Sequence, residues 1–159
     1  MPKRSAGLLL YRRSGNAIEV LLVHPGGPFW ANRDEGAWSV PKGEVDGADD
    51  GTDDRGTAAR EFAEELGHPP PATGWLDLGE VVQSGAKRVR AWAAEGDLDT
   101  TKLKSNTFET EWPPRSGRRA TFPEVDRAMW CTAEVAARLL VPAQVELVDR
   151  LFAQLGGAD

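Results

Sequence analysis

Three glutamates, Glu61, Glu64 and Glu65, are the residues of this 159-residue chain whose types and spacing are best suited to chemistry. They fall at positions i, i+3 and i+4 of a segment with helical periodicity, so their side chains are expected on one face of a helix. Like charges at this spacing destabilise an isolated helix by about 0.2–0.5 kcal/mol per pair. We therefore expect a positive group to compensate them.

Two kinds of positive group suit this face. Arg60 precedes Glu64 by four residues and can hold that carboxylate in a fixed orientation. Mg2+ or Mn2+ also fits, because these hard cations bind one or two carboxylates and keep water and substrate phosphate in their remaining positions. A water-exposed acidic face without any ligand is the alternative, since runs of charge are commonly just solvated.

The glutamates are expected on a short amphipathic helix over residues 58–67. Gly67 suits the left-handed residue that ends many helices, and Asp53 or Asp54 is expected to cap the helix start rather than to bind metal. The apolar residues at helical spacing are Ala58, Ala59, Phe62, Ala63 and Leu66.

The stretch from Gly43 to Gly67 resembles the Nudix box, G-x5-E-x7-R-E-U-x-E-E-x-G-U, in which U is a bulky apolar residue. Residues 60–67, REFAEELG, match its second half, and His68 replaces the final apolar residue. Arg60 follows Gly43 by seventeen positions where the family pattern has fourteen, which implies three extra residues in the loop. The isolated glutamate of the pattern would fall on Asp49 or Thr52, depending on the end from which one counts, so no residue is given that role.

The resemblance implies an α/β/α sandwich with a mixed β-sheet and an enzyme that hydrolyses a pyrophosphate bond in a nucleoside diphosphate-linked substrate with Mg2+ or Mn2+. It also implies roles for particular residues. The metal ligands are Glu61, Glu64, Glu65 and the Gly43 carbonyl; Arg60 orients a carboxylate next to the catalytic Glu61. Glu124, with Asp126 as its substitute, is the candidate for a base or a further metal ligand.

Candidate substrate contacts lie outside the box. Lys42 is expected either to meet substrate phosphate or to be an ordinary surface lysine. Arg115, with Arg118 and Arg119, either clamps outer phosphates or belongs to a solvated basic loop.

Two further features bear on the substrate. Trp30 beside a glycine-rich loop either stacks a nucleobase or, with Phe29, plugs the loop onto the core. The segment at 123–130, PEVDRAMW, resembles the equivalent part of diadenosine polyphosphate hydrolases in the Nudix family. This favours a dinucleoside polyphosphate over a nucleoside triphosphate or ADP-ribose. A competing hypothesis is a nucleotide-sensing module that binds without efficient hydrolysis, because the loop is displaced and its glutamate is missing.

Periodicity elsewhere predicts a single domain over residues 1–159, built from strands followed by helices. Residues 95–122 are expected to be largely irregular, and the lone His24 and His68 to be structural or exposed. The strands are expected at 5–12, 18–24, 37–40, 75–83 and 87–94, with a last strand near 125–130 and helices at 132–140 and 142–155.

Composition limits the partners. There are 25 acidic and 19 basic side chains, a net charge of -6, which argues against binding to duplex nucleic acid or to an anionic membrane. The apolar run at 6–10 is too short for a signal peptide or a membrane span. Cys131 is the only cysteine, so it cannot form an intramolecular disulfide and is expected to be a small buried hydrophobe. We expect a cytoplasmic monomer or homodimer acting on a nucleotide-type substrate.

Overall fold

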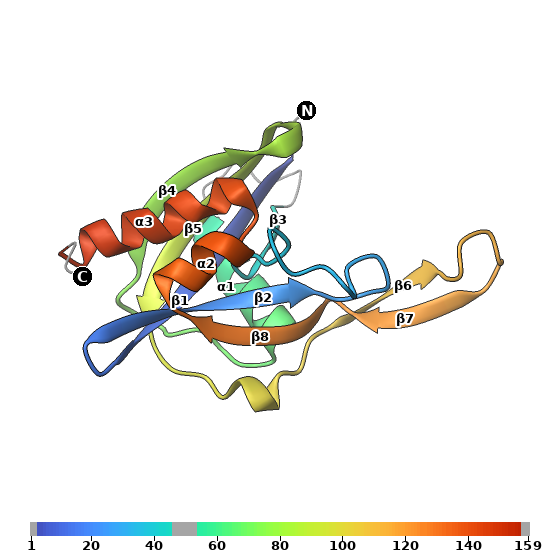
Figure 1. Ribbon diagram of the computed structural model, residues 1–159, viewed down its shortest axis with the longest axis horizontal. Coiled ribbons are helices and arrows are strands. Elements are labelled where there is room, and N and C mark those ends of the chain that lie inside the picture. Colours follow the sequence, from blue (N-terminus) through green and yellow to red (C-terminus); the bar gives the residue numbers. More distant parts are fainter. Residues whose placement is uncertain (1–2, 46–53, 157–159) are drawn as a thin grey trace.

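The computed structural model describes residues 3–45 and 54–156, and in them a six-stranded sheet lies between helices (Figure 1). Its strand order is β4-β5-β1-β2-β8, with β3 paired to β1. Strand β1 is antiparallel to β2 and β3 but parallel to β5, so the sheet is mixed, as predicted. The strands are β1 (Arg4–Ser14), β2 (Ala17–Pro25), β3 (Lys42–Glu44), β4 (Leu76–Gln83), β5 (Lys87–Glu95) and β8 (Val125–Cys131).

Helices cover both faces of this sheet, which explains the continuous apolar runs of its central strands. Helix α1 (Asp54–Leu66) packs on the face that carries Leu8 and Leu21, whereas α2 (Ala133–Leu139) and α3 (Val145–Gln154) cover the face that carries Leu9 and Leu22. Short 3-10 turns occupy Ser84–Ala86, Thr100–Lys102 and Pro142–Gln144. The predicted α/β/α sandwich is confirmed (Figure 1).

Helix α1 begins at Asp54, four residues before the predicted start, and ends at Leu66, one residue before the Gly67 cap. Gly67 has φ +75°, the left-handed conformation expected of a C-terminal cap. Asp54 lies in the first turn, where its carboxylate complements the helix dipole and lies 3.1 Å from Arg4 Nη2. Asp53, like Asp49 and Thr52, is outside the described residues.

The strand predictions hold for both pairs, β1–β2 and β4–β5, and Val89 and Trp92 point to opposite faces as their spacing predicts. The predicted strand at 37–40 is wrong, because Trp38 and Ser39 make only isolated bridges and the strand starts at Lys42. The C-terminal helices are confirmed, with the Thr132 hydroxyl capping α2. No helix of the described residues has the length and apolarity to span a bilayer.

The prediction that residues 95–122 are irregular is wrong in its second half. Strands β6 (Thr107–Glu111) and β7 (Arg119–Pro123) pair as a separate antiparallel hairpin that projects from the body of the molecule (Figure 1). Phe108 lies opposite Phe122 with ring centroids 6.1 Å apart, on the half-buried face of the hairpin. The alternation is present in the sequence, but threonines and charged residues occupy most positions, so the apolar period is weak.

Two aromatic residues near the start of the loop after β2, Phe29 and Trp30, lie at the surface. Phe29 is 61% exposed and Trp30 40% exposed, so the prediction that they plug the loop onto the core is wrong. Phe29 packs edge-to-face on Trp112 of the hairpin, with centroids 5.6 Å apart. Stacking of a nucleobase on these aromatic rings stays a prediction.

Gly67 permits a test of the α1 cap, because a Cβ there would lie 2.5 Å from the Lys104 carbonyl oxygen. We expect Gly67→Ala to lose about 1–2 kcal/mol of unfolding free energy from the left-handed backbone alone, with a further loss from the clash. Gly15→Ala is the matched control, since Gly15 has φ +62° and nothing within 4 Å of its added Cβ. Urea unfolding of both variants measures the difference, and equal losses would show that the Lys104 contact is unimportant.

Candidate metal and catalytic site

Strand β3 and helix α1 meet at a very close contact between Gly43 and Glu61. A Cβ added to Gly43 would lie 2.0 Å from Glu61 Oε1, so only glycine lets this carboxylate approach the strand. Pairing of Gly43 with Ala6 of β1 anchors the strand in the main sheet. The structure therefore brings together the two ends of the predicted box, although the residues between 45 and 54 are not described.

Lys42 lies on the same strand and faces Glu65. Burial lowers the pKa of the Lys42 ammonium group, and the nearby Glu65 carboxylate partly opposes this effect. The Lys42 backbone also forms a hydrogen bond with the Glu65 carboxylate. Lys42 is thus a half-buried cation beside the glutamate cluster rather than an ordinary surface lysine.

The carboxylates carry more negative charge than their surroundings compensate. Burial raises the pKa of Glu65 to about 8, with further upward effects from Glu61 and Glu124 and an opposing effect from Lys42. Burial also raises the pKa of Glu61, followed by repulsion from Glu64. A site with this imbalance favours either protons or a cation.

Arg60 compensates only part of the negative charge of these carboxylates. Its Nε lies 3.5 Å from Glu64 Oε2 and its Nη2 lies 3.4 Å from Glu61 Oε2, so one guanidinium group joins two of the carboxylates. The predicted contact at i, i+4 is present. Because the Arg60 side chain is 54% exposed, these pairs orient the carboxylates more than they stabilise the fold.

Glu124 reaches the cluster from the bend between β7 and β8. Its N–H donates to the Asn106 carbonyl at 2.8 Å, and its carbonyl accepts from the Gly26 N–H at 2.9 Å. A cleft of about 280 Å³ joins it to the glutamates. The residues lining this cleft are Lys3, Ser5, Lys42, Gly43, Glu44, Glu61, Glu65, Gln83, Lys87, Val89 and Glu124.

Sequence reasoning missed the cleft residues contributed by β4 and β5. Gln83 ends β4 and Lys87 begins β5, on either side of a tight turn. Nothing in the sequence marks Gln83 and Lys87 as site residues, because polar residues are common on either side of such a turn. Only the parallel pairing of β5 with β1 brings Lys87 next to Lys42 and Glu65.

Several residues predicted for the site do not line the cleft. Arg115 lies in the turn between β6 and β7, at the end of the hairpin that extends away from α1 (Figure 1). Arg119, on the same hairpin, is paired with Glu109 at 2.8 Å. The Asp126 carboxylate, proposed as the substitute for Glu124, instead contacts His24 at 2.7 Å.

A larger cleft, of about 1000 Å³, is lined by β8, α2 and the loop after β2. Its carboxylates are already compensated, because Asp34 lies 3.1 Å from Arg127 Nη2 and Asp126 contacts His24. The smaller cleft, lined by Glu61, Glu65 and Glu124, is therefore the candidate for the metal and catalytic site.

The side chains of the smaller cleft fit a hard divalent cation by their chemistry. Glu61 and Glu65 line the cleft and supply carboxylate oxygens, and Gly43 supplies a nearby backbone carbonyl. Glu64, the third predicted ligand, is not among the lining residues and pairs with Arg60. Within residues 3–45 and 54–156, however, no group of three acidic, histidine or cysteine side chains is by itself arranged to hold a metal ion. Any cation here would depend on backbone, water or substrate oxygens as well.

Comparison with known proteins agrees with this geometry. Residues 1–151 match the family model of the NUDIX domain. The chain belongs to the Nudix family, and as a member it is a pyrophosphohydrolase, a hydrolase that acts on phosphorus-containing acid anhydrides. Nudix hydrolases generally use divalent metal ions.

Solved structures show the same fold. An Ap4A hydrolase from C. elegans, in a binary complex, has a TM-score of 0.65 at 23% identity, over 97% of this chain and 99% of that one. The NUDIX domain of Shewanella oneidensis NrtR, complexed with ADP ribose, has a TM-score of 0.65 at 18% identity, over 98% and 89%. RenU, a Nudix hydrolase from M. smegmatis, has a TM-score of 0.56 at 22% identity, over 98% and 86%. No curated protein sequence matches the chain significantly.

Gly43→Ala tests whether close approach of the strand to Glu61 is needed at the site. The flexible Glu61 side chain can swing away from an added Cβ, so we expect the unfolding free energy to fall by less than about 1 kcal/mol. Mn2+ affinity should nevertheless fall at least roughly tenfold, because ligand geometry is lost. Calorimetric titration with Mn2+ measures this effect, and unchanged affinity would contradict the role of the glycine.

The raised pKa of Glu65 predicts how stability depends on pH in metal-free protein. Between its ordinary pKa of 4.5 and about 8, the folded state binds more protons than the unfolded state, so stability falls as pH rises through this window. We expect Glu65→Gln to flatten the slope and to raise the unfolding free energy at pH 8.5 but hardly at pH 5.5.

Denaturant unfolding in EDTA at the two pH values measures this change. Glu64→Gln is the matched control, because the Glu64 side chain is 37% exposed and pairs with Arg60. A similar change of slope in both variants would mean that burial of Glu65 is not the cause.

Proposed function

We propose that this Nudix domain uses Mg2+ or Mn2+ to hydrolyse a pyrophosphate bond in a nucleoside diphosphate-linked substrate. The observation that carries the proposal is the crowding of Glu61 and Glu65 in one cleft, which burial and mutual repulsion make costly without a cation. A cleft that already contains Lys42 and Lys87 and still has excess negative charge suits a cation–phosphate pair better than a phosphate alone.

The proposed cation ligands are Glu61, Glu64, Glu65 and the Gly43 carbonyl. When bound, a divalent cation lowers the pKa of water and withdraws charge from phosphate oxygens. Arg60 keeps the carboxylates of Glu61 and Glu64 oriented, since it contacts both.

The remaining residues of the cleft handle the phosphate and the proton. Lys42 and Lys87 present ammonium groups to the phosphate oxygens from β3 and β5. Glu124, across the cleft from β3, accepts the proton of the attacking water at its carboxylate and acts as the general base. Arg115 contacts the substrate only if the substrate is long enough to reach the β6–β7 hairpin.

Among substrates of this class we favour a dinucleoside polyphosphate. Two observations support it: the resemblance of residues 123–130 to diadenosine polyphosphate hydrolases, and the likeness of the fold to the C. elegans Ap4A hydrolase. The exposed rings of Phe29 and Trp30 offer a surface on which a base can stack.

A second candidate function is nucleotide binding with little hydrolysis. It is favoured by the absence of glutamate at Asp49 and Thr52, the positions counted for the isolated glutamate of the pattern. The complex of the NrtR NUDIX domain with ADP ribose shows that this fold can be crystallised with an intact nucleotide ligand.

A substrate panel separates the two functions. We expect the protein with Mg2+ or Mn2+ to cleave at least one member of a panel of dinucleoside polyphosphates, nucleoside triphosphates and ADP-ribose, followed by chromatography of the products. Glu65→Gln should lower kcat by roughly 100-fold or more, because the charge that attracts the cation is reduced.

Glu109→Gln is the control for this experiment, since Glu109 is an exposed hairpin residue outside the cleft. Tight binding of a panel member without cleavage would support the sensing module. Full activity of Glu65→Gln would contradict the proposed metal site.

A further inference from the structure

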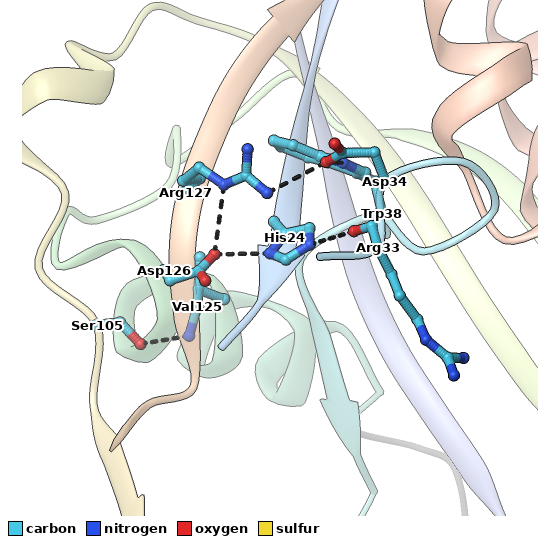
Figure 2. Close-up of polar contacts among 8 residues, drawn as sticks. All are labelled: His24, Arg33, Asp34, Trp38, Ser105, Val125, Asp126 and Arg127. Atoms are coloured by element: carbon cyan, nitrogen blue, oxygen red, sulfur yellow. Dashed lines mark hydrogen bonds and ion pairs between the residues drawn. The ribbon is translucent and has the colours of Figure 1, made fainter. Parts of the chain in front are cut away.

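His24 is a fully buried imidazole at the end of β2, and both of its ring nitrogens have oxygen partners (Figure 2). Nδ1 lies 2.7 Å from Asp126 Oδ1 on β8, and Nε2 lies 2.6 Å from the Arg33 carbonyl oxygen in the loop after β2. Trp38 packs against the ring edge-to-face at 5.2 Å. The imidazole therefore joins three separate segments of the chain.

The two hydrogen bonds differ in kind. A backbone carbonyl can only accept, so Nε2 carries a hydrogen and donates it to Arg33. Nδ1 and the Asp126 carboxylate are joined through one hydrogen whichever of the two atoms holds it. Loss of either bond leaves a polar atom without its partner beside a side chain that has no exposure to water, which is expensive.

Asp126 occupies a special place in the sheet. His24 pairs with Arg127 of β8, whereas the next residue, Pro25, pairs with Val125, so Asp126 is the extra residue of a β-bulge. Pro25 has no N–H to donate to the ladder, and prolines within sheets are commonly found at bulges. Bulges re-aim the chain and its side chains, and here the bulged residue is fixed by a side-chain bond to His24.

Glu124 lies immediately before this bulge. The carbonyl of Glu124 accepts from the N–H of Gly26, two residues beyond His24, while Asp126 lies two residues beyond Glu124. Two contacts thus join the end of β2 to the start of β8: the side-chain contact of His24 with Asp126, and the backbone hydrogen bond from Gly26 to Glu124. Rotation of the bulge would turn the backbone that delivers the Glu124 side chain to the cleft.

The other restraints near Glu124 do not replace this bond. The Val125 N–H donates to Ser105 Oγ at 3.0 Å and holds the strand to its neighbouring segment (Figure 2). Arg127 reaches Asp34 at 3.1 Å and Asp126 at 3.8 Å, but its side chain is half exposed, and exposed ion pairs contribute little. Of the drawn contacts, only that of His24 with Asp126 joins a fully buried side chain to the bulged residue.

We propose that His24 is a positioning residue for the hydrolytic reaction: through Asp126 it fixes the bulge of β8 and so aims Glu124 at the glutamate cleft. The inference rests on the proposed function, in which Glu124 is the general base. It assigns to a buried histidine, which does not line the glutamate cleft, an effect on kcat rather than on substrate affinity.

Two substitutions of His24 separate its hydrogen bonds. In His24→Asn the side-chain amide can take the place of Nδ1 and keep the bond to Asp126, while the bond to Arg33 is lost. In His24→Gln the amide can take the place of Nε2 and keep the bond to Arg33, while the bond to Asp126 is lost. We expect His24→Gln to lower kcat roughly 10- to 100-fold with KM within about twofold, and His24→Asn to retain most of kcat.

A double-mutant cycle then tests whether the effect passes through Glu124. In the Glu124→Gln background, His24→Gln should lower kcat no further, because the residue that it positions no longer acts as a base. Val148→Ala is the control for general destabilisation, since Val148 is a buried residue of α3, on the face of the sheet away from α1. It should lower the unfolding free energy and leave kcat unchanged.

A second pair of variants serves if His24→Gln does not fold. Asp126→Asn retains a side chain that can hydrogen-bond to Nδ1, and Asp126→Ala does not, so kcat should fall strongly only in Asp126→Ala. All kinetics use whichever panel substrate the wild-type protein cleaves, with Mg2+ present.

The outcomes are distinguishable. Equal losses of kcat in His24→Asn and His24→Gln, or the same loss from His24→Gln with and without Glu124, would overturn the positioning role alone. Full kcat in Glu124→Gln would overturn both that role and the assignment of Glu124 as base. Inactivity of the wild-type protein on every panel member would instead count against the proposed hydrolysis, and with it against any effect of His24 on a rate.

Discussion

Burial of neighbouring carboxylates, to which their mutual repulsion adds, is the constraint on which the rest of this structure depends. Glu61 and Glu65 lie close enough, and far enough from water, that the pKa of each is raised, that of Glu65 to about 8. A fold selected for stability alone would place lysine or an apolar residue at one of these positions. The chain instead surrounds them with a glycine contact, a half-buried lysine and an exposed arginine that contacts Glu61 and Glu64.

The glutamates of this site are held in two different ways, by a packed helix and by hydrogen bonds at a strand end. On one side, α1 is seated on the sheet by Phe62 and Leu66, so its glutamates are held by the packing of an entire helix. On the other side, Glu124 is held at the end of a strand by a few hydrogen bonds next to a bulge. The second arrangement has fewer contacts, and the buried His24 adds one of them through Asp126.

The likeness to other Nudix structures extends over nearly the whole chain, but at 23% identity or less in the compared structures it shows the fold and not the substrate. Outside helix α1, this chain has the β6–β7 hairpin and the aromatic residues Phe29 and Trp112, which contact one another.

The sequence by itself determined the local features, because each depends on neighbouring residues: the α1 helix with its Gly67 cap, the common face of Glu61, Glu64 and Glu65, and the paired strands. It also determined the family, since the box is a contiguous pattern. Only the tertiary structure decided which distant residues join the cluster. Lys87 lies beside the cluster because β5 pairs in parallel with β1. Arg115 lies away from it because it belongs to a hairpin, and the apolar alternation of that hairpin is too weak to be recognised in the sequence.

The role of His24 has the same origin. A lone histidine before a proline has no chemical pattern in the sequence, and Asp126 is 102 positions away along the chain. Their contact exists because β2 and β8 are adjacent and because one residue of β8 is extra at that point. Long-range pairing and register depend on the whole sheet, and for this reason no local stretch of sequence contains them.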